Sequence, residues 1–329
     1  MRFRPDDEQR EFARSLDGML AAAGTPAVVR AWSVGDHGPG RTLWTRLAEA
    51  GVFALAVPEA YDGLGPRPVE LAVAFTESGR HAVPGPLVET VAVAALLDGL
   101  GDPTLAADRL PGIASGKTVA SLCLTASGVP FALDADAADV VFVVTDDTVR
   151  VAESTGPVQP SADPARRLAR PLGGTVVARG PAVRTAAARA ADLAALTTAA
   201  QALGLGRALL DGAVTHVKRR TQFGRPIGSF QALKHRLADT LIALEFAEPL
   251  VHAAAVALAT GRSDGARDIA AAKVAAGEAA CRAARTALRC HGALGYTEEL
   301  DLSLWIRKAR ALRTAWGTPA DCRARVLME

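Results

Sequence analysis

The stretch RRTQFGRPIGSFQALKHRLADT, residues 219–240, decides the predicted fold of this chain. Arg219 and Arg220 end one helical pattern, where cations suit the helix dipole. Pro226 and Gly228 then precede a second helical pattern that starts near Ser229. Taken alone, the stretch is a well-capped connection between two helices. The cations in it would crowd one another without an anion or an acidic partner: they include Arg220, Arg225, Lys234 and Arg236.

A second turn, HGALGYTEE (residues 291–299), lies between two later helical patterns. Glycine at such a turn lets the backbone approach a phosphate-bearing ligand closely. The two turns together therefore predict an anion site in a helical bundle.

Composition divides the chain into three predicted domains. Residues 1–116 carry helical patterns, such as Asp7 to Ala23, broken by turn clusters. Residues 117–181 contain about four short β-branched runs, and Asp146 and Asp147 join two of them as a hairpin in an antiparallel sheet. Residues 182–329 are rich in Ala and Leu and predict three long helices and one or two shorter ones. The predicted fold is mainly α, with an N-terminal helical domain, an abbreviated antiparallel β domain and a C-terminal helical bundle.

The overall composition excludes several classes of function. Among 329 residues, 37 basic and 35 acidic side chains leave a net charge of +2, which gives no general field for nucleic acid. The early acidic residues do not suit a signal peptide, and we expect no membrane span because no apolar run reaches the roughly 18 residues that one needs. The cysteines lie far apart and lack metal-ligand spacing, so we expect reduced thiols, no metal site and a cytoplasmic protein: they are Cys123, Cys281, Cys290 and Cys322.

The order of helices, small sheet and bundle, with the two turns above, resembles the acyl-CoA dehydrogenase family of flavoenzymes. VPEAYDGLG (residues 57–65) is similar to that family's Pro-Glu-x-Tyr-Gly-Gly-Leu-Gly turn. The chain resembles in particular the short bacterial members that form heterotetramers of two different subunits. The resemblance implies an acyl-CoA substrate, and FAD held between the sheet domain of one subunit and the bundle of its neighbour.

The resemblance also implies cofactor-binding residues. Arg220 would pair with the FAD pyrophosphate as a fixed cation and planar donor. The other implied cofactor-binding residues are Gln222 and Phe223 in the same turn, Gln231 at the next helix, and Gly292 and Gly295 in the Gly-rich turn. Ala293 departs from the pattern, because it stands where the family usually has Gly.

The catalytic base of the family is missing from its usual position. Removing the α-proton of an acyl-CoA needs a carboxylate, while the β-hydrogen passes to the flavin as hydride. Gly317, Thr318 and Arg323 keep the surrounding pattern, but Trp316 stands where the Glu belongs. Other members place the Glu early in the first bundle helix; here that position falls near Ala194, and the nearest acid is Asp192, most simply a helix surface residue.

The flavin platform of the sheet domain is also altered. LCLTASGVPFALDADAADVVFVV (residues 122–144) replaces the family's segments that support the flavin ring. One interpretation is a subunit that completes the FAD site of a catalytic partner. A second is a self-sufficient homo-oligomer with an unidentified base, such as Asp192 or Glu245. A third is a non-catalytic scaffold that binds no flavin.

Overall fold

Helix α7 (Pro181–Arg219) contributes to both of the compact units that the chain forms. The computed structural model describes residues 6–125 and 130–328. The bundle unit consists of residues 1–26, 72–83 and 195–329, and the sheet unit consists of residues 27–71 and 84–194. This grouping follows spatial contacts rather than chain order, so the three predicted sequence domains remain a prediction.

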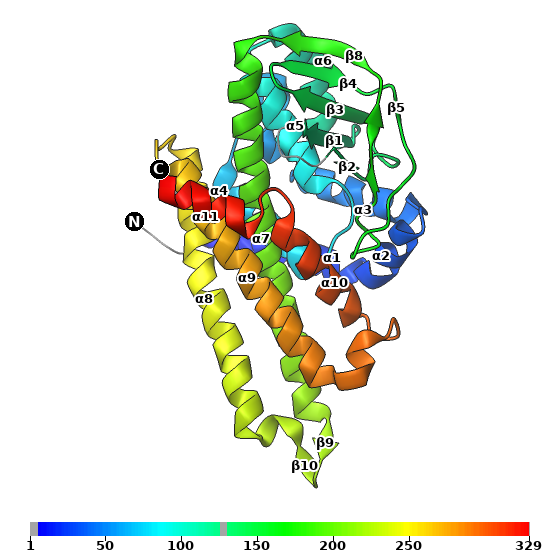
Figure 1. Ribbon diagram of the computed structural model, residues 1–329, viewed down its shortest axis with the longest axis vertical. Coiled ribbons are helices and arrows are strands. Elements are labelled where there is room, and N and C mark those ends of the chain that lie inside the picture. Colours follow the sequence, from blue (N-terminus) through cyan, green and yellow to red (C-terminus); the bar gives the residue numbers. More distant parts are fainter. Residues whose placement is uncertain (1–5, 126–129, 329) are drawn as a thin grey trace. The chain divides into compact units, whose positions relative to one another are not determined.

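The bundle unit is built on long helices rich in alanine. Helices α8 (Gln231–Ala259) and α9 (Gly265–His291) lie side by side in Figure 1, and α9 also packs against α10 (Leu302–Thr314) and α11 (Pro319–Met328). A stripe of small residues on α9 is buried, which lets these helices approach closely: it includes Ala272, Ala276, Ala280, Ala283 and Ala287. The predicted bundle of three long and two shorter helices is confirmed.

Two other helices complete the bundle unit. Helix α1 (Asp7–Ala22) begins with a capping box, in which Asp6 accepts a hydrogen bond from the backbone N–H of Gln9. Helix α4 (Pro68–Arg80) approaches α7 through two glycines. A Cβ on Gly79 would lie 2.0 Å from the Gln201 carbonyl oxygen, and a Cβ on Gly204 would lie 1.8 Å from that of Thr76. Only glycine permits this close packing.

The sheet unit contains a four-stranded sheet in the order β1-β3-β4-β8. The hairpin of β3 and β4 is confirmed, and Asp146 takes a positive φ of 50° at its turn. The sheet is mixed rather than purely antiparallel, because β1 and β3 run parallel. The parallel pairing arises because no tight turn joins β1 to β3, which are separated in the sequence by the short strand β2 (Ala132–Leu133). The strands are β1 (Ala120–Leu124), β3 (Val140–Thr145), β4 (Thr148–Val151) and β8 (Thr175–Arg179).

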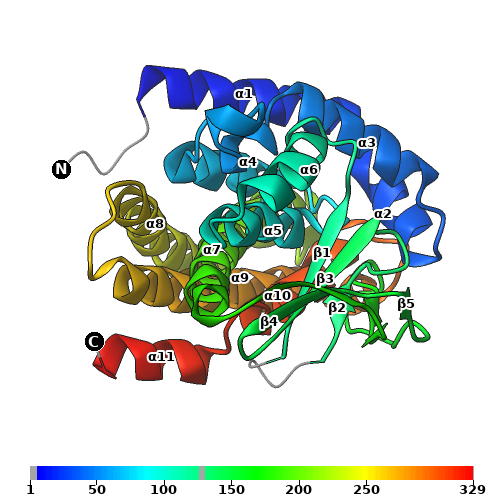
Figure 2. The same ribbon diagram turned by 90° about the horizontal axis from the view of Figure 1, so that it is seen from above.

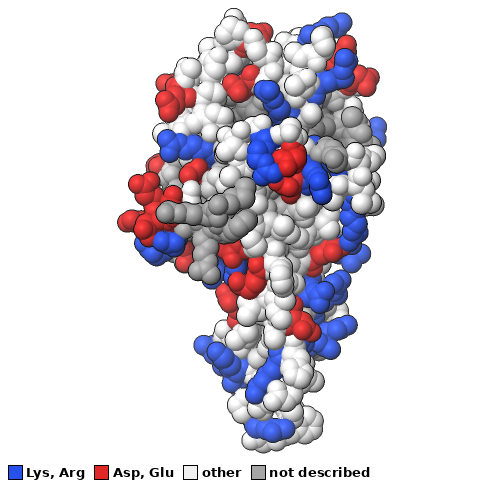
Figure 3. Space-filling model, turned by 90° about the vertical axis from the view of Figure 1, so that its left-hand side faces the viewer, with Lys and Arg blue, Asp and Glu red and all other residues white. Residues whose placement is uncertain are grey.

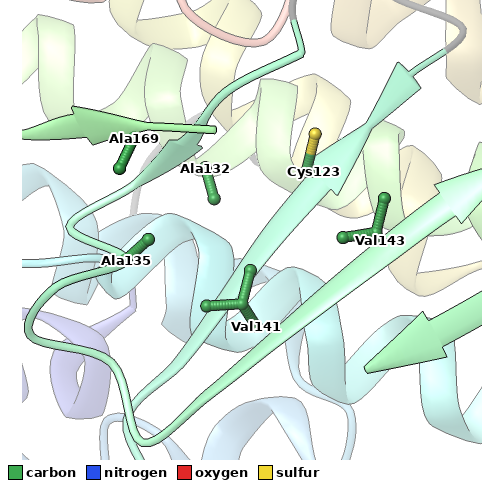
Figure 4. Packing of buried hydrophobic residues seen from close by; sticks show 6 residues of the cluster. All are labelled: Cys123, Ala132, Ala135, Val141, Val143 and Ala169. Carbon is green, nitrogen blue, oxygen red and sulfur yellow. The ribbon is translucent and has the colours of Figure 1, made fainter. Parts of the chain in front are cut away.

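Helix α5 covers this sheet. Figure 2 shows α5 beside β1, and the Thr90 hydroxyl donates to the Ala120 carbonyl oxygen at 2.7 Å. Figure 4 shows a cluster of small buried side chains, including Cys123, Val141 and Val143, between β1, β3 and the short β2–β6 pair. The remaining elements of the sheet unit are α2 (Thr25–Ser33, begun in the bundle unit), α3 (Gly38–Glu49), η1 (Ala54–Ala56), η2 (Glu59–Tyr61), α5 (Leu87–Gly99), α6 (Pro103–Ala114), β2 (Ala132–Leu133), β5 (Ser154–Thr155), β6 (Leu168–Ala169) and β7 (Pro171–Leu172).

Within the described residues, two helices are long and apolar enough to cross a membrane by length and composition, contrary to the prediction that no segment is. The apolar window of α7 is 89% buried inside the structure, as expected of a core helix in a bundle. The window of α8 is 33% buried, so much of its apolar surface faces outward. Length and composition alone are weak support for a membrane segment, since core helices pass the same test.

The four cysteines are free thiols, as predicted. Burial raises the pKa of each thiol, which disfavours the reactive thiolate.

Candidate functional site

The segment after α7 forms a small hairpin rather than a simple helix connection. Strand β9 (Thr221–Gln222) pairs with β10 (Arg225–Pro226), and Phe223 and Gly224 make the turn with φ of 53° and 74°. Positive φ at both turn residues matches the twist of a two-residue hairpin. The Ile227 N–H donates to the Arg220 carbonyl oxygen at 2.8 Å and closes the hairpin, after which η4 (Ile227–Ser229) leads into α8.

Aromatic side chains stabilise this hairpin. The Arg225 guanidinium lies 4.2 Å from the ring centroid of Phe230, a cation–π contact. The rings of Phe223 and Phe230 pack edge to face with their centroids 6.1 Å apart, but Phe223 remains 89% exposed. Phe223 therefore combines a left-handed backbone, which costs about 1 kcal/mol or more, with an almost fully exposed ring. That combination is typical of a residue that contacts another molecule.

A cavity of about 700 Å³ lies in the bundle unit beside this hairpin. Its walls come from the end of α7, the end of α9 and the start of α10. The Trp305 indole N–H donates to the Arg80 carbonyl oxygen at 2.8 Å, which fixes one wall. The lining residues are Pro26, Gly212, Thr215, His216, Arg219, Arg220, His291, Leu300, Asp301, Leu302 and Trp305. The cavity thus brings Arg220 of the first predicted turn together with His291 of the second.

The cavity has a cationic lining. In the part of the chain that the structure describes, no carboxylate lies within 4.0 Å of the side-chain nitrogens of Arg219 or Arg220. Other cations on and beside the hairpin are exposed: Lys218, Arg225, Lys234 and Arg236. Figure 3 shows blue Lys and Arg side chains at the lower end of the face that it draws. Unpaired guanidinium groups in a concave site favour an anionic ligand, because planar donors bind phosphate or carboxylate oxygens in pairs.

The Gly-rich turn uses its two predicted glycines differently. Gly292 ends α9 with φ 59° and ψ −136°, and a Cβ there would meet open space. Gly295 is buried, and its Cβ would lie 2.9 Å from Leu288 Cδ1. Packing against α9 therefore accounts for Gly295, whereas Gly292 stays accessible in η5 (Gly292–Tyr296). Gln222 and Gln231 are exposed on the hairpin and at the first turn of α8, and their cofactor contacts remain predictions.

Trp316 lies between α10 and α11 in a strained backbone conformation, with φ of 54°. The buried Lys273 of α9 holds this connection, since its ammonium donates to three backbone carbonyl oxygens. Those oxygens belong to Leu312 at 3.0 Å, Arg313 at 3.2 Å and Gly317 at 3.2 Å. The lysine thereby satisfies the end of α10, where carbonyl groups lack helical partners.

The retained residues after Trp316 have local structural roles. A Cβ on Gly317 would lie 2.8 Å from Cys322 Sγ, and φ at Gly317 is 125°. The Thr318 hydroxyl oxygen accepts from the Asp321 backbone N–H at 3.2 Å, which caps α11, and the hydroxyl donates to the Asp321 carboxylate at 2.6 Å. Arg323 pairs with Glu278 of α9.

Comparison with known proteins decides the family. The family model described as "Acyl-CoA dehydrogenase, N-terminal domain" matches residues 6–117. The family model described as "Acyl-CoA dehydrogenase, C-terminal domain" matches residues 184–326. The chain belongs to the acyl-CoA dehydrogenase family. Members of this family are oxidoreductases that act on a CH–CH bond.

Two curated acyl-CoA dehydrogenases of Mycobacterium tuberculosis illustrate the relationship. IpdE2 is 32% identical over 330 residues, which cover 99% of this chain and 98% of IpdE2. FadE34 is 34% identical over 318 residues, which cover 92% of this chain and 44% of FadE34.

Solved structures show the same fold. Butyryl-CoA dehydrogenase from Megasphaera elsdenii matches with a TM-score of 0.87 at 23% identity, over 100% of each chain. A chain of the ChsE4-ChsE5 complex from Mycobacterium tuberculosis matches with a TM-score of 0.86 at 22% identity, over 100% of this chain and 98% of that one.

The acidic residues considered as substitutes for the acyl-CoA dehydrogenase base are engaged elsewhere. Glu245 accepts a hydrogen bond from Arg207 at 3.2 Å, and Glu248 accepts one from the same guanidinium at 2.6 Å. This ion-pair network accounts for Glu245 without a catalytic role. Asp192 is half-buried and also has an interaction partner. Ala194, at the alternative base position, is fully buried.

A charged cluster in the bundle unit lies outside these predictions. Asp17 of α1, Glu77 of α4 and His81 directly after α4 place possible metal-ligand atoms within 4.8 Å of one another. Asp17 already pairs with His81 Nε2 at 2.7 Å and with Arg80 Nε at 3.8 Å, and Arg80 brings a positive charge. We therefore describe the cluster as an ion-pair network. Sequence spacing could not reveal it, because its members come from different helices.

Lys273 is the residue of this region that sequence reasoning missed. A lysine in an alanine-rich helix is usually exposed, yet Lys273 is only 2% exposed. Its place on the buried stripe of α9, between Ala272 and Ala276, was the available signal.

Proposed function

We propose that this chain is a subunit of an FAD-dependent acyl-CoA dehydrogenase and completes the FAD site of a homologous partner subunit. The observation that carries the proposal is a coincidence within the bundle unit. The cavity contains the unpaired Arg219 and Arg220, and the sequence pattern of Gly317, Thr318 and Arg323 implies that Trp316 occupies the position of the family's catalytic Glu.

The residues of the cavity fit the phosphate-bearing half of FAD. Arg219 and Arg220 offer planar donors to the pyrophosphate, and the exposed Phe223 ring offers an apolar face for a nucleoside. Gln222 and Gln231 lie on the same hairpin and helix start and can donate hydrogen bonds. Bound FAD would supply the hydride acceptor for the reaction.

Trp316 cannot supply the proton acceptor. The indole N–H is a donor only and has no lone pair to take a proton from carbon. The Lys273 ammonium is also a donor only, and it already donates hydrogen bonds to three backbone carbonyl oxygens. A carboxylate from another chain would therefore remove the α-proton of the acyl-CoA.

The outward face of α8 supports a contact with the partner subunit. Ile242, Phe246 and Leu250 recur every four residues on this helix and are 41% to 73% exposed. Such a stripe is costly in water and is typical of a subunit interface. The fold neighbour described as the ChsE4-ChsE5 complex is a precedent for assembly of two different chains. The free cysteines support a cytoplasmic location for the proposed heterotetramer.

Substitution of Arg220 by Glu tests the proposal. The purified complex of Arg220→Glu is expected to lose its flavin, measured as the ratio of flavin to protein absorbance, because the new carboxylate repels the pyrophosphate. Arg184→Glu is the matched control, since Arg184 is an exposed arginine at the other end of α7. Equal flavin content in the complexes of wild type and Arg220→Glu would refute the proposal, and a complex that never contains flavin would favour a scaffold.

A further inference from the structure

Two histidines in the cavity have no role in the function proposed above. The rings of His216 and His291 are in contact, with centroids 4.0 Å apart and planes inclined by 34°. Both side chains are half-buried and line the same cavity as Arg219 and Arg220. Asp301 is the one carboxylate among the described lining residues.

Hydrogen bonding fixes the tautomer of one ring. His291 Nδ1 lies 2.8 Å from the Ala287 carbonyl oxygen. A carbonyl oxygen only accepts, so Nδ1 carries the hydrogen and donates it. Nε2 of His291 is therefore the ring nitrogen that is left to contact a ligand.

The surroundings disfavour charge on the His216 ring in the absence of a ligand. Burial lowers the pKa of His216, and the nearby His291 and Arg220 lower it further. Two imidazolium rings at 4.0 Å, beside two guanidinium groups, would repel one another. At neutral pH the free cavity thus holds His216 in its neutral form.

An entering phosphate reverses this balance. An anion within a few ångströms stabilises the protonated imidazole and offsets the repulsion among the four side chains. We propose that His216 and His291 form, together with Arg219 and Arg220, a proton-linked clamp for the phosphate groups of the ligand. Binding then brings a proton from solvent into the cavity. This inference rests on the proposed function, because the ligand is the pyrophosphate half of FAD.

The consequence is a cofactor affinity that depends on pH through this chain's own residues. The pyrophosphate of FAD is a diester whose charge stays constant near neutrality, so a pH dependence reports on the protein. For one linked proton, affinity falls by up to tenfold for each pH unit between the pKa of the free cavity and the higher pKa of the occupied cavity.

Calorimetric titration of FAD into the flavin-depleted complex of the full-length chain with its partner subunit tests the clamp. The heat of binding is measured at pH 7 in two buffers with different ionisation enthalpies, which gives the number of protons taken up. We expect uptake of up to one proton per FAD in the wild type, and much less in His216→Gln and His291→Gln. His235→Gln is the matched control, because His235 is exposed on α8 and does not line the cavity.

The outcomes separate the two proposals. If FAD binds the wild type and both cavity variants with the same proton uptake, or with none, the clamp is wrong and the proposed function stands. If FAD binds neither the wild-type chain nor its partner complex through this cavity, the proposed function fails and the clamp fails with it.

Discussion

Replacement of Lys273 by Met removes a buried charge that holds the connection carrying Trp316. The ammonium donates to three carbonyl oxygens at 3.0–3.2 Å. Hydrogen bonds from a charged donor contribute about 1.5–3 kcal/mol each. Burial of the ammonium costs several kcal/mol, so the gross sum overstates the effect. Because Met fills a similar volume but leaves three buried acceptors without their donor, we expect a net loss of about 3 kcal/mol in the free energy of unfolding.

Thermal unfolding followed by circular dichroism measures this loss. At roughly 2–4 °C for each kcal/mol in a domain of this size, the Tm of Lys273→Met should fall by about 6 °C or more. Lys117→Met is the control, because Lys117 is exposed and its removal should leave the Tm within about 1 °C. A Tm for Lys273→Met equal to that of the control would show that the three hydrogen bonds do not stabilise the bundle unit.

Three further predictions concern packing, pH and assembly. Gly204→Ala should destabilise the bundle unit by about 2 kcal/mol or more, because the new Cβ would collide with the Thr76 carbonyl oxygen. Gly18→Ala in α1, where the new Cβ meets open space, should instead raise the free energy of unfolding by about 0.5–1 kcal/mol. Urea titration measures both changes, and equal effects would contradict the close packing at Gly204. Burial raises the pKa of Glu77 to about 7. The folded state therefore favours the neutral carboxyl, and the free energy of unfolding falls by about 2 kcal/mol, after allowance for solvent screening, as the pH rises from about 4.5 through 7. Glu77→Gln should lose most of that pH dependence in urea titrations at pH 5 and pH 8. An unchanged pH dependence would show that Glu77 is not its source. Phe246→Asp should separate the subunits in light scattering while the Tm of the isolated chain stays the same; an intact assembly would place the interface elsewhere.

Much of the fold follows from local sequence signals. The four β-branched runs became β1, β3, β4 and β8, and the Ala/Leu-rich zone became the bundle helices. These features depend on neighbouring residues, whose spacing sets the helical or strand period. The parallel pairing of β1 with β3 depends instead on long-range contacts that periodicity does not report.

In the candidate site, too, the local motifs could be predicted from the sequence and the long-range contacts could not. The turn motifs and Trp316 could be recognised in the sequence, and the structure brings Arg220 and His291 to one cavity. The ring contact of His216 with His291 and the burial of Lys273 could not be predicted, because each joins residues from different helices. Part of the altered flavin platform, residues 126–129, lies outside the described residues.

The most direct test of the central claim is the visible absorbance spectrum of the chain, purified alone and again after co-expression with a homologous dehydrogenase subunit encoded beside it. The account predicts a colourless protein alone, and a yellow complex that bleaches on addition of an acyl-CoA. A yellow protein that bleaches with an acyl-CoA in the absence of any partner would contradict it, since the chain would then hold a complete site and its own base.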